Sequence, residues 1–217
     1  MGLNESKGNM YDFVTHTWNT VKGQCYHDCS YCYMKRWGKL KPVRFDQKEL
    51  KTDLGYGNFI FVGSSCDMWA KDIPEEWIKE TLWHCGKYEG NKYLFQTKNP
   101  KNIRRILTYE SNVCVTLETN RHYPNIMHNS PTPQERYDEM IYIQHPLYIT
   151  IEPILDFDYD VFCDMIYECG PMQVNIGADS GNNHLPEPPK DKILNLIDEL
   201  SYITKVVQKP NLKRLLK

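Results

Sequence analysis

Three cysteines, Cys25, Cys29 and Cys32, lie within eight residues in the run CYHDCSYCYM. Cysteine thiolates bind zinc or iron–sulfur clusters. A structural zinc site takes four protein ligands, usually as two separated pairs, and the further candidate ligand nearby is His27. A cubane cluster held by three cysteines leaves one iron open to another ligand, and an open position is typical of catalytic metal sites. The spacing therefore favours a [4Fe-4S] cluster over zinc.

The composition fits one globular domain spanning residues 1–217, with 41% hydrophobic and 25% charged residues. We find no apolar stretch of membrane-spanning length and no basic-then-apolar leader pattern, so we expect no membrane association. The eight cysteines are then expected to be reduced thiols of a cytoplasmic protein, without a second cysteine-rich block for an auxiliary cluster. A net charge of −2 gives no global electrostatic case for nucleic acid and favours a small ligand over a long polyanion. The oligomeric state is left open.

Short apolar runs alternate with helical patterns along the chain. The runs have the length and the β-branched or aromatic content of strands, and they cover residues 58–63, 92–97, 112–118, 146–152 and 172–177. Helical patterns follow at residues 74–88, 100–109, 132–144, 159–168 and 189–201. This alternation predicts parallel βαβ units. A further strand is expected before the cysteines, within residues 13–21, and a trailing strand near residues 205–208.

Polar side chains follow the expected strands, at the point where each strand ends. They are Ser64, Ser65, Lys98, Glu118, Glu152 and Asp179. The carboxyl ends of parallel strands converge on one mouth, where (β/α) barrels keep their active sites. With six strands and a cysteine loop after the first, we expect an α/β fold, a partial (β/α)6 TIM-like barrel with the cysteines at its mouth.

The cysteine spacing, with an aromatic residue just before the last cysteine, resembles the signature of the radical S-adenosylmethionine (SAM) superfamily. Six further blocks occur in order: THTWN (15–19), FVGSSCDMW (61–69), QTKNP (96–100), TLETN (116–120), TIEPILD (150–156) and IGADSGNNHLPEP (176–188). Together they resemble a phage-associated radical SAM family of uncharacterised function that is itself related to spore photoproduct lyase. The resemblance implies the partial (β/α)6 barrel, a [4Fe-4S] cluster, and SAM bound at the open iron.

The same resemblance implies the reaction and its partners. SAM is cleaved reductively to methionine and a 5′-deoxyadenosyl radical, which abstracts hydrogen from an organic substrate. A reductant such as flavodoxin or ferredoxin is then a partner. The aromatic residues and basic clusters near the cysteine loop favour a nucleotide or nucleic-acid base as substrate, through stacking and phosphate contacts. The alternative is a zinc- or iron–sulfur-binding interaction module without radical chemistry, which would not need βα alternation over the whole chain.

Several residues are implied as SAM contacts. Tyr31 is expected near the adenine, and Ser64 and Ser65 lie where the superfamily contacts the amino group of SAM. Lys98 is a candidate partner of the SAM carboxylate, because an ammonium group is a compact point charge. The simpler interpretation is a polar turn for the serines and a solvated side chain for the lysine.

Acidic residues at the strand ends are candidates for sugar or substrate contacts. Glu118 could accept the ribose hydroxyls, with Thr116 on the same face of its strand, although a structural ion pair would also explain Glu118. Glu152 and Asp179 could hold substrate or cap the helix that follows each of them. The polar loop at residues 182–184 could close over the substrate.

Two residues are candidates for catalysis by hydrogen-atom return. Spore photoproduct lyase passes the hydrogen atom back through a cysteine and tyrosines, and Tyr33 lies where one such tyrosine does. Cys66, near the end of the second apolar run, is close to the place of the donor cysteine. The simpler interpretation of Cys66 is a small buried side chain, because free cysteine is among the most buried residue types.

Overall fold

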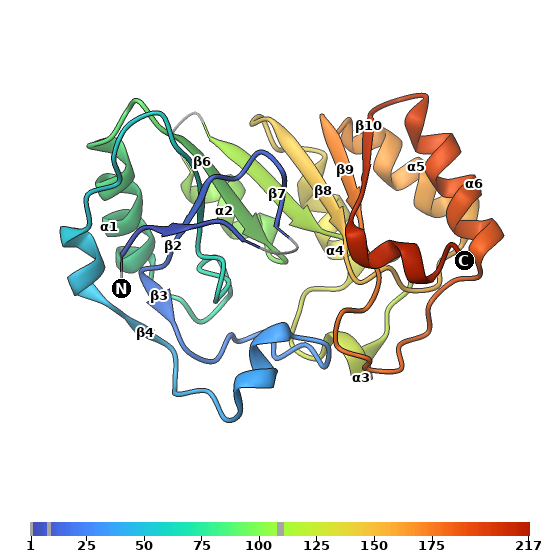
Figure 1. Ribbon diagram of the computed structural model, residues 1–217, viewed down its shortest axis with the longest axis horizontal. Helices are drawn as coiled ribbons and strands as arrows, with labels where there is room; N and C mark the ends of the chain where they lie inside the picture. Colours follow the sequence, from blue (N-terminus) through green and yellow to red (C-terminus); the bar gives the residue numbers. More distant parts are fainter. Residues whose placement is uncertain (1, 8–9, 108–110) are drawn as a thin grey trace.

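The computed structural model describes residues 2–7, 10–107 and 111–217. Its centre is an eight-stranded sheet in the order β1-β2-β5-β6-β7-β8-β9-β10 (Figure 1). These strands are β1 Asn4–Glu5, β2 His16–Trp18, β5 Phe59–Val62, β6 Lys92–Thr97, β7 Asn112–Thr116, β8 Leu147–Ile151, β9 Gln173–Ile176 and β10 Lys205–Gln208. Neighbours from β2 to β10 run parallel, whereas β1 pairs antiparallel with β2.

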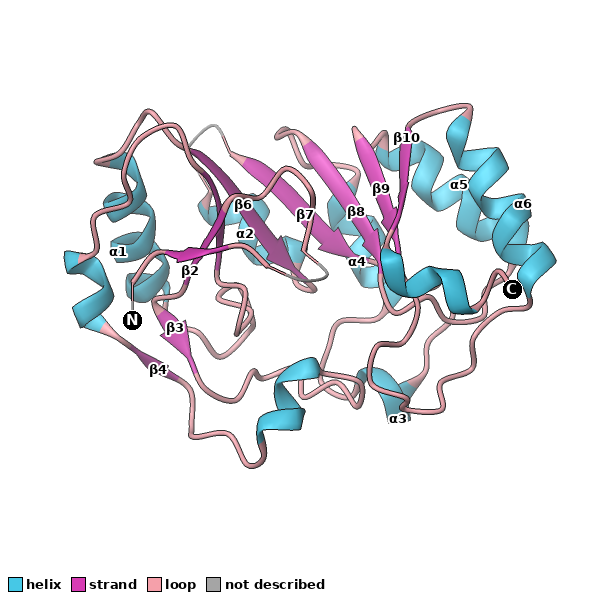
Figure 2. Ribbon diagram, in the orientation of Figure 1, coloured by secondary structure: helices cyan, strands magenta, loops and turns pink. Residues whose placement is uncertain are grey.

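Helices connect the parallel strands and cover one face of the sheet (Figure 2). They are α1 Glu75–Gly86, α2 Pro100–Ile106, α4 Pro133–Met140, α5 Tyr159–Cys169 and α6 Lys190–Ser201. The shorter elements are the strand pair β3 Val21–Lys22 and β4 Arg44–Phe45, the helix α3 Pro124–Met127, and the 3₁₀ helices η1 Tyr33–Trp37, η2 Gln47–Lys51 and η3 Pro210–Arg214. No helix among the described residues is long and apolar enough to cross a membrane.

Period-two alternation along the strands separates the two faces of the sheet. In β7, Val113 and Val115 belong to the main core beneath the helices, and Cys114 between them belongs to a second cluster on the inner face. Both clusters consist of buried residues, so the strands are covered on both faces. This explains why the strands are nearly continuous apolar runs in the sequence.

The segment between β1 and β2 fills the inner face. Tyr11 is 6% exposed, stacks on Phe13 with ring centroids 5.6 Å apart, and packs in the cluster that contains Leu94 and Cys114. Its hydroxyl donates to Oε1 of Gln96 at 2.8 Å. The interior below the carboxyl ends of the strands is therefore occupied by side chains, and space is left at the mouth.

The structure confirms the α/β partial-barrel prediction, with an open sheet whose edges are β1 and β10. All six expected strands are present, and the trailing strand is β10. The strand expected over residues 13–21 is shorter, because the chain leaves the sheet after Trp18 and Val21–Lys22 pairs with β4 instead. The helix expected over residues 132–144 ends at Met140. The helix expected over residues 100–109 ends at Ile106, and its last two predicted residues lie outside the described residues.

Candidate active site

The three motif cysteines, Cys25, Cys29 and Cys32, lie on one loop that joins β3 to η1. Tight turns shape this loop, since the amide of Cys32 donates to Cys29 O at 3.1 Å. The α3 region holds it from the side, because the amide of Ser30 donates to Ile126 O at 2.9 Å. These backbone hydrogen bonds fix the loop beside the carboxyl ends of the strands.

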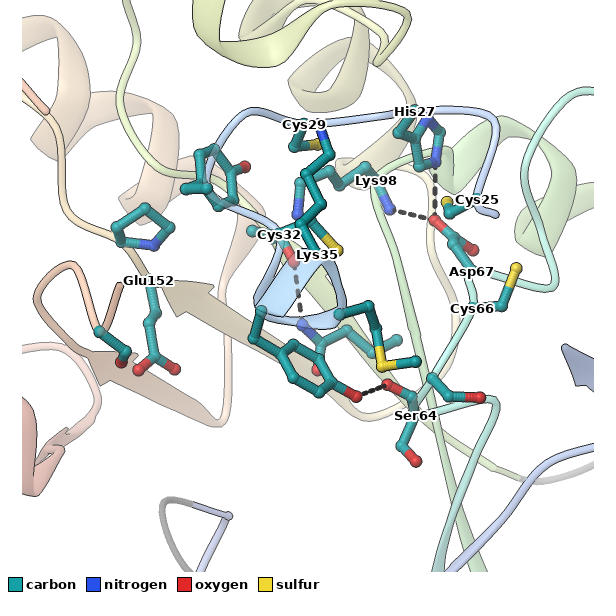
Figure 3. A pocket seen from close by; sticks show the side chains of 18 of the residues that line it. Cys25, His27, Cys29, Cys32, Lys35, Ser64, Cys66, Asp67, Lys98 and Glu152 are labelled. Atoms are coloured by element: carbon teal, nitrogen blue, oxygen red, sulfur yellow. Dashed lines mark hydrogen bonds and ion pairs between the residues drawn. The ribbon is translucent and has the colours of Figure 1, made fainter. Parts of the chain in front are cut away.

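A cavity of about 570 Å³ lies at this edge of the sheet, and all three thiols line it (Figure 3). Cys29 is buried, Cys25 and Cys32 are partly exposed, and all eight cysteines are free. Among the described residues, no three histidine, cysteine or acidic side chains stand close enough to hold one metal ion. In a cubane each cysteine binds a separate iron, so the thiols need a common cavity rather than a common ion. The donor set therefore fits an iron–sulfur cluster.

Cys66, in the turn after β5, lies beside Cys25 at the cavity wall (Figure 3). Cys66 is 4% exposed. Their mutual hydrogen bond lowers the pKa of Cys25 and raises the pKa of Cys66. A thiolate is the form of cysteine that binds metal, so this pairing favours Cys25 as a ligand.

Tyr33 lines the same cavity from the first residue of η1. Its hydroxyl donates to Ser64 O at 2.7 Å, and the partial burial of this half-exposed side chain raises its pKa to about 12. The cavity thus brings together both candidate catalytic residues, Tyr33 and Cys66.

The predicted serines form a turn that Asn19 organises. Asn19 Oδ1 accepts hydrogen bonds from Ser64 Oγ at 3.2 Å and from the amide of Ser65 at 2.9 Å. Gly63 begins the turn with a φ of +81°, a left-handed conformation that glycine adopts without steric cost. Both serines line the cavity, so the polar-turn interpretation and a SAM contact are compatible.

Asp67 joins three segments of the site, and sequence reasoning did not single it out. Its Oδ2 accepts hydrogen bonds from His27 Nε2 at 2.8 Å, Thr97 Oγ1 at 3.0 Å and the amide of Lys98 at 2.9 Å. Burial alone would raise the pKa of Asp67, but the hydrogen bond from His27 and those from the amides of Lys98 and Trp69 leave the pKa lowered. Asp67 therefore connects the cysteine loop to the ends of β5 and β6. Its place in the turn that follows the buried strand β5 was the available sequence signal.

Glu118 lies behind the cavity wall and is fully buried. Its Oε2 pairs with Arg136 Nη1 at 2.5 Å, its Oε1 lies 3.6 Å from Lys98 Nζ, and the Tyr31 hydroxyl donates to it. Burial alone would raise the pKa of Glu118, but the charges of Arg136 and Lys98 lower it to about 2. The structural ion pair that we considered for Glu118 is present, and it anchors two of the predicted SAM contacts. Thr116, on the same inner face of the sheet, lines the cavity itself.

Arg136 was missed by the sequence reading. It is fully buried in α4 and also donates to Thr116 O at 2.8 Å and to Pro131 O at 2.8 Å. An arginine in a helix is usually a surface residue, so the sequence carries no signal of its burial.

The opposite side of the cavity is formed by Glu152 and residues near the end of the last strand (Figure 3). Glu152 Oε2 pairs with Lys209 Nζ at 2.7 Å, and its Oε1 accepts from Asn211 Nδ2 at 2.7 Å. A Cβ at Gly177 would lie 2.7 Å from Glu152 Oε1, so glycine is required for this approach. Lys209 and Asn211 come from a segment for which the sequence predicted only a trailing strand.

Asp179 also lines this side, and its carboxylate is engaged within its own loop. It accepts from the amide of Gly181 at 2.9 Å and from Asn183 Nδ2 at 2.6 Å. The alternative that Glu152 and Asp179 cap the helices that follow them is wrong. The N-cap residues of α5 and α6 are Asp158 and Pro189. The loop at residues 182–184 is exposed and carries none of the cavity lining that the structure describes.

The fold is that of radical SAM enzymes, as structural comparison shows. A variant of spore photoproduct lyase with bound AdoMet and dinucleoside spore photoproduct matches with a TM-score of 0.59 and 11% sequence identity, covering 90% of this chain and 64% of that one. Methylornithine synthase (PylB) matches with a TM-score of 0.54 and 12% identity, covering 88% and 70%. The chain thus spans about two thirds of the length of these proteins.

At the level of sequence, no protein-family model and no curated protein matches the chain. The likeness is therefore one of fold. The phage association suggested by the sequence blocks stays a prediction.

Proposed function

We propose that this protein is a radical SAM enzyme that abstracts hydrogen from an organic substrate, a nucleotide or a nucleic-acid base. One observation carries the proposal. The three free thiols of a single loop line one cavity at the carboxyl ends of parallel strands, in a chain with the fold of radical SAM enzymes. A cavity of about 570 Å³ is also in the size range of sites for cofactors and small substrates.

Cys25, Cys29 and Cys32 would hold a [4Fe-4S] cluster. When bound, the cluster would supply one electron to SAM, whose cleavage yields methionine and a 5′-deoxyadenosyl radical. The lowered pKa of Cys25 supports its thiolate form near neutral pH. Flavodoxin or ferredoxin is the proposed source of the electron.

Lys98 would contact the SAM carboxylate, and Ser64 and Ser65 its amino group. Lys98 is suited to this task because Glu118 lies 3.6 Å away and raises the pKa of Lys98 against the effect of burial. Its ammonium group therefore stays charged at the cavity wall. Tyr31 near the adenine and Thr116 near the ribose complete the proposed SAM contacts. The direct ribose contact expected of Glu118 does not fit its place behind the cavity wall, where its carboxylate instead holds Tyr31 and Lys98.

Cys66 would return a hydrogen atom to the substrate radical, with Tyr33 as the relay. Their common place on the cavity wall supports this pair, and a packing role for Cys66 is the competing interpretation. The Cys66→Ala variant separates the two. With deuterated SAM and the substrate, a changed product or accumulated radical adducts support the donor role, and an unchanged product at an unchanged rate removes it.

Anaerobic reconstitution tests the proposal directly. The protein should take up about four irons with sulfide, and with dithionite and SAM it should release methionine and 5′-deoxyadenosine. Alanine at Cys25, Cys29 or Cys32 should abolish both properties. The Cys163→Ala variant is a matched control, because this cysteine is a partly exposed thiol on α5, away from the cavity. Stoichiometric zinc without iron would contradict the proposal and favour the interaction-module alternative.

The same assay tests the SAM contacts. The Lys98→Ala variant should keep its cluster and lose SAM affinity by tens-fold, because a hydrogen bond to a charged group contributes on the order of 1.5–3 kcal/mol. Lys79 on α1 is the control, since it is exposed and pairs with Glu75 at 2.7 Å. Unchanged affinity in the Lys98 variant would remove this residue from the SAM site.

A further inference from the structure

The segment that follows the last motif cysteine has an unusual charge. Between Asp28 and Asp46 the chain carries five lysine and arginine residues and no acidic residue, although the whole chain has a net charge of −2. Figure 1 shows this segment running along one edge of the molecule, from η1 to β4. Lys35 pairs with Asp28 at 2.9 Å, and the other four cations make no ion pair with any residue that the structure describes.

Two aromatic side chains stand among these cations. Trp37 is 70% exposed and Tyr33 is 47% exposed, whereas Trp18 and Trp69 are fully buried. The Arg36 guanidinium lies 5.4 Å from the ring centroid of each exposed aromatic. We call the set Tyr33, Arg36, Trp37, Lys39, Lys41 and Arg44 the basic–aromatic strip. Its tryptophan offers a stacking face that no core packing requires.

The strip is continuous with the cavity. Tyr33 and Arg36 belong both to the strip and to the cavity lining, and η1 begins directly after Cys32. A ligand with one group in the cavity therefore has cations and an aromatic face along its path outward. The cavity volume of about 570 Å³ suits a cofactor and one base-sized group, so a longer ligand must extend out of the cavity, and the strip borders it.

From this arrangement we propose that the strip binds single-stranded nucleic acid, with phosphates on its cations and a base stacked on Trp37, so that a neighbouring nucleotide reaches the cavity. Aromatic platforms beside a positively charged track are the physical means by which proteins bind single strands. The proposal rests on the proposed function and makes its substrate a polynucleotide rather than a free nucleotide. An acidic reductant protein would also favour cations, but it would not require a stacking face that leads into the cavity.

The test is fluorescence anisotropy with a labelled single-stranded oligonucleotide of about 12 nucleotides and the cluster-loaded protein, without SAM or reductant. The Trp37→Ala variant should weaken binding by about tenfold. The Trp83→Ala variant should bind like the parent protein. It is a matched control, because Trp83 is 61% exposed on α1 with Lys87 Nζ 3.4 Å from its ring centroid.

Salt dependence tests the cations. Alanine at Lys39, Lys41 and Arg44 together should reduce the slope of log affinity against log salt by about 2, because each single-strand phosphate contact contributes about 0.7. Alanine at the exposed Lys79, Lys101 and Lys190 should leave the slope unchanged. Iron content is measured in every variant, so that a lost cluster is not mistaken for lost binding.

Three results would overturn the inference. They are no binding of the oligonucleotide, binding that the strip variants leave unchanged, and strip variants that instead slow cluster reduction by an acidic flavodoxin. Because the assay needs no SAM cleavage, its failure is separable from failure of the proposed function. If the protein cleaves SAM but does not bind the oligonucleotide, only this inference is contradicted. If it binds the oligonucleotide through the strip but does not cleave SAM, only the proposed reaction is contradicted.

Discussion

At the scale of single residues, the site depends on one buried carboxylate. Glu118 is fully buried and is compensated by Arg136 at 2.5 Å and Lys98 at 3.6 Å. A buried charge that loses its partner is strongly destabilising, more so than an exposed ion pair that is broken. The Arg136–Glu118 pair should therefore matter for folding as well as for the shape of the cavity wall.

Replacing the buried arginine tests this point. The Arg136→Met variant should lower the free energy of unfolding by about 3–5 kcal/mol, because Glu118 is left with its more distant cation. Urea denaturation measures the change. The control is Arg104→Met, which removes a more exposed pair with Glu139 and should cost under about 1 kcal/mol. Equal losses of unfolding free energy in the Arg136→Met and Arg104→Met variants would contradict the assignment of Arg136 and Glu118 as a buried ion pair.

The same carboxylate predicts a pH dependence. The folded-state pKa of Glu118 is about 2, below its ordinary value, so its stabilisation is complete above the unfolded pKa of about 4.3 and is lost as pH falls toward 2. Between about pH 5 and pH 2 the parent protein should lose about 3 kcal/mol more stability than the Glu118→Gln variant. Chemical denaturation at several pH values checks this, with Glu139→Gln as the control. Parallel pH profiles of parent and Glu118→Gln proteins would refute it.

At the scale of elements, the sequence predicts the strands well because they are buried on both faces. In β7 the three central residues Val113, Cys114 and Val115 are all apolar, so both faces of the strand are apolar there. Polar residues follow the strands, and the parallel sheet brings them to one edge. The three cysteines could be assigned from spacing alone. Their neighbours could not, because Arg136 and Lys209 enter the site only through the packing of α4 and the approach of the last strand.

Asp67 links the turn after β5 to the cysteine loop and to the end of β6 through its hydrogen bonds. An Asp67→Asn substitution keeps the size of the side chain but removes the charge opposite His27 and an acceptor shared by Thr97 and Lys98. The free energy of unfolding should fall by about 1–3 kcal/mol, with reduced iron retention on gel filtration. Asp198→Asn, at an exposed position on α6, should change neither quantity.

At the scale of the whole molecule, we expect the folded core not to depend on the proposed cluster. The main hydrophobic cluster lies between the sheet and its helices, and the cysteine loop packs only against its edge through Cys25 and Tyr26. Small zinc modules, by contrast, unfold without their metal.

Removal of the cluster with a chelator and an oxidant should therefore leave the body folded. Hydrogen exchange should increase in residues 23–42, while amides of β6, β7 and β8 keep their protection. Intact near-ultraviolet circular dichroism would accompany this pattern. Global unfolding on removal of the metal would favour the interaction-module alternative.

The contact between Lys209 and Glu152 sets an order of events in the synthesis of the protein. Lys209 completes the cavity wall with Glu152, and its Nζ also lies 4.7 Å from the ring centroid of Tyr11, so early and late parts of the chain meet at one point. Contacts between residues so distant in sequence form only after the entropy of closing a long loop has been overcome. On the ribosome the cysteine loop emerges early, but the wall opposite it is missing until residue 209 has been synthesised. Iron delivered to the proposed cluster site would therefore meet a complete cavity wall only after residue 209 has been synthesised and has packed against Glu152.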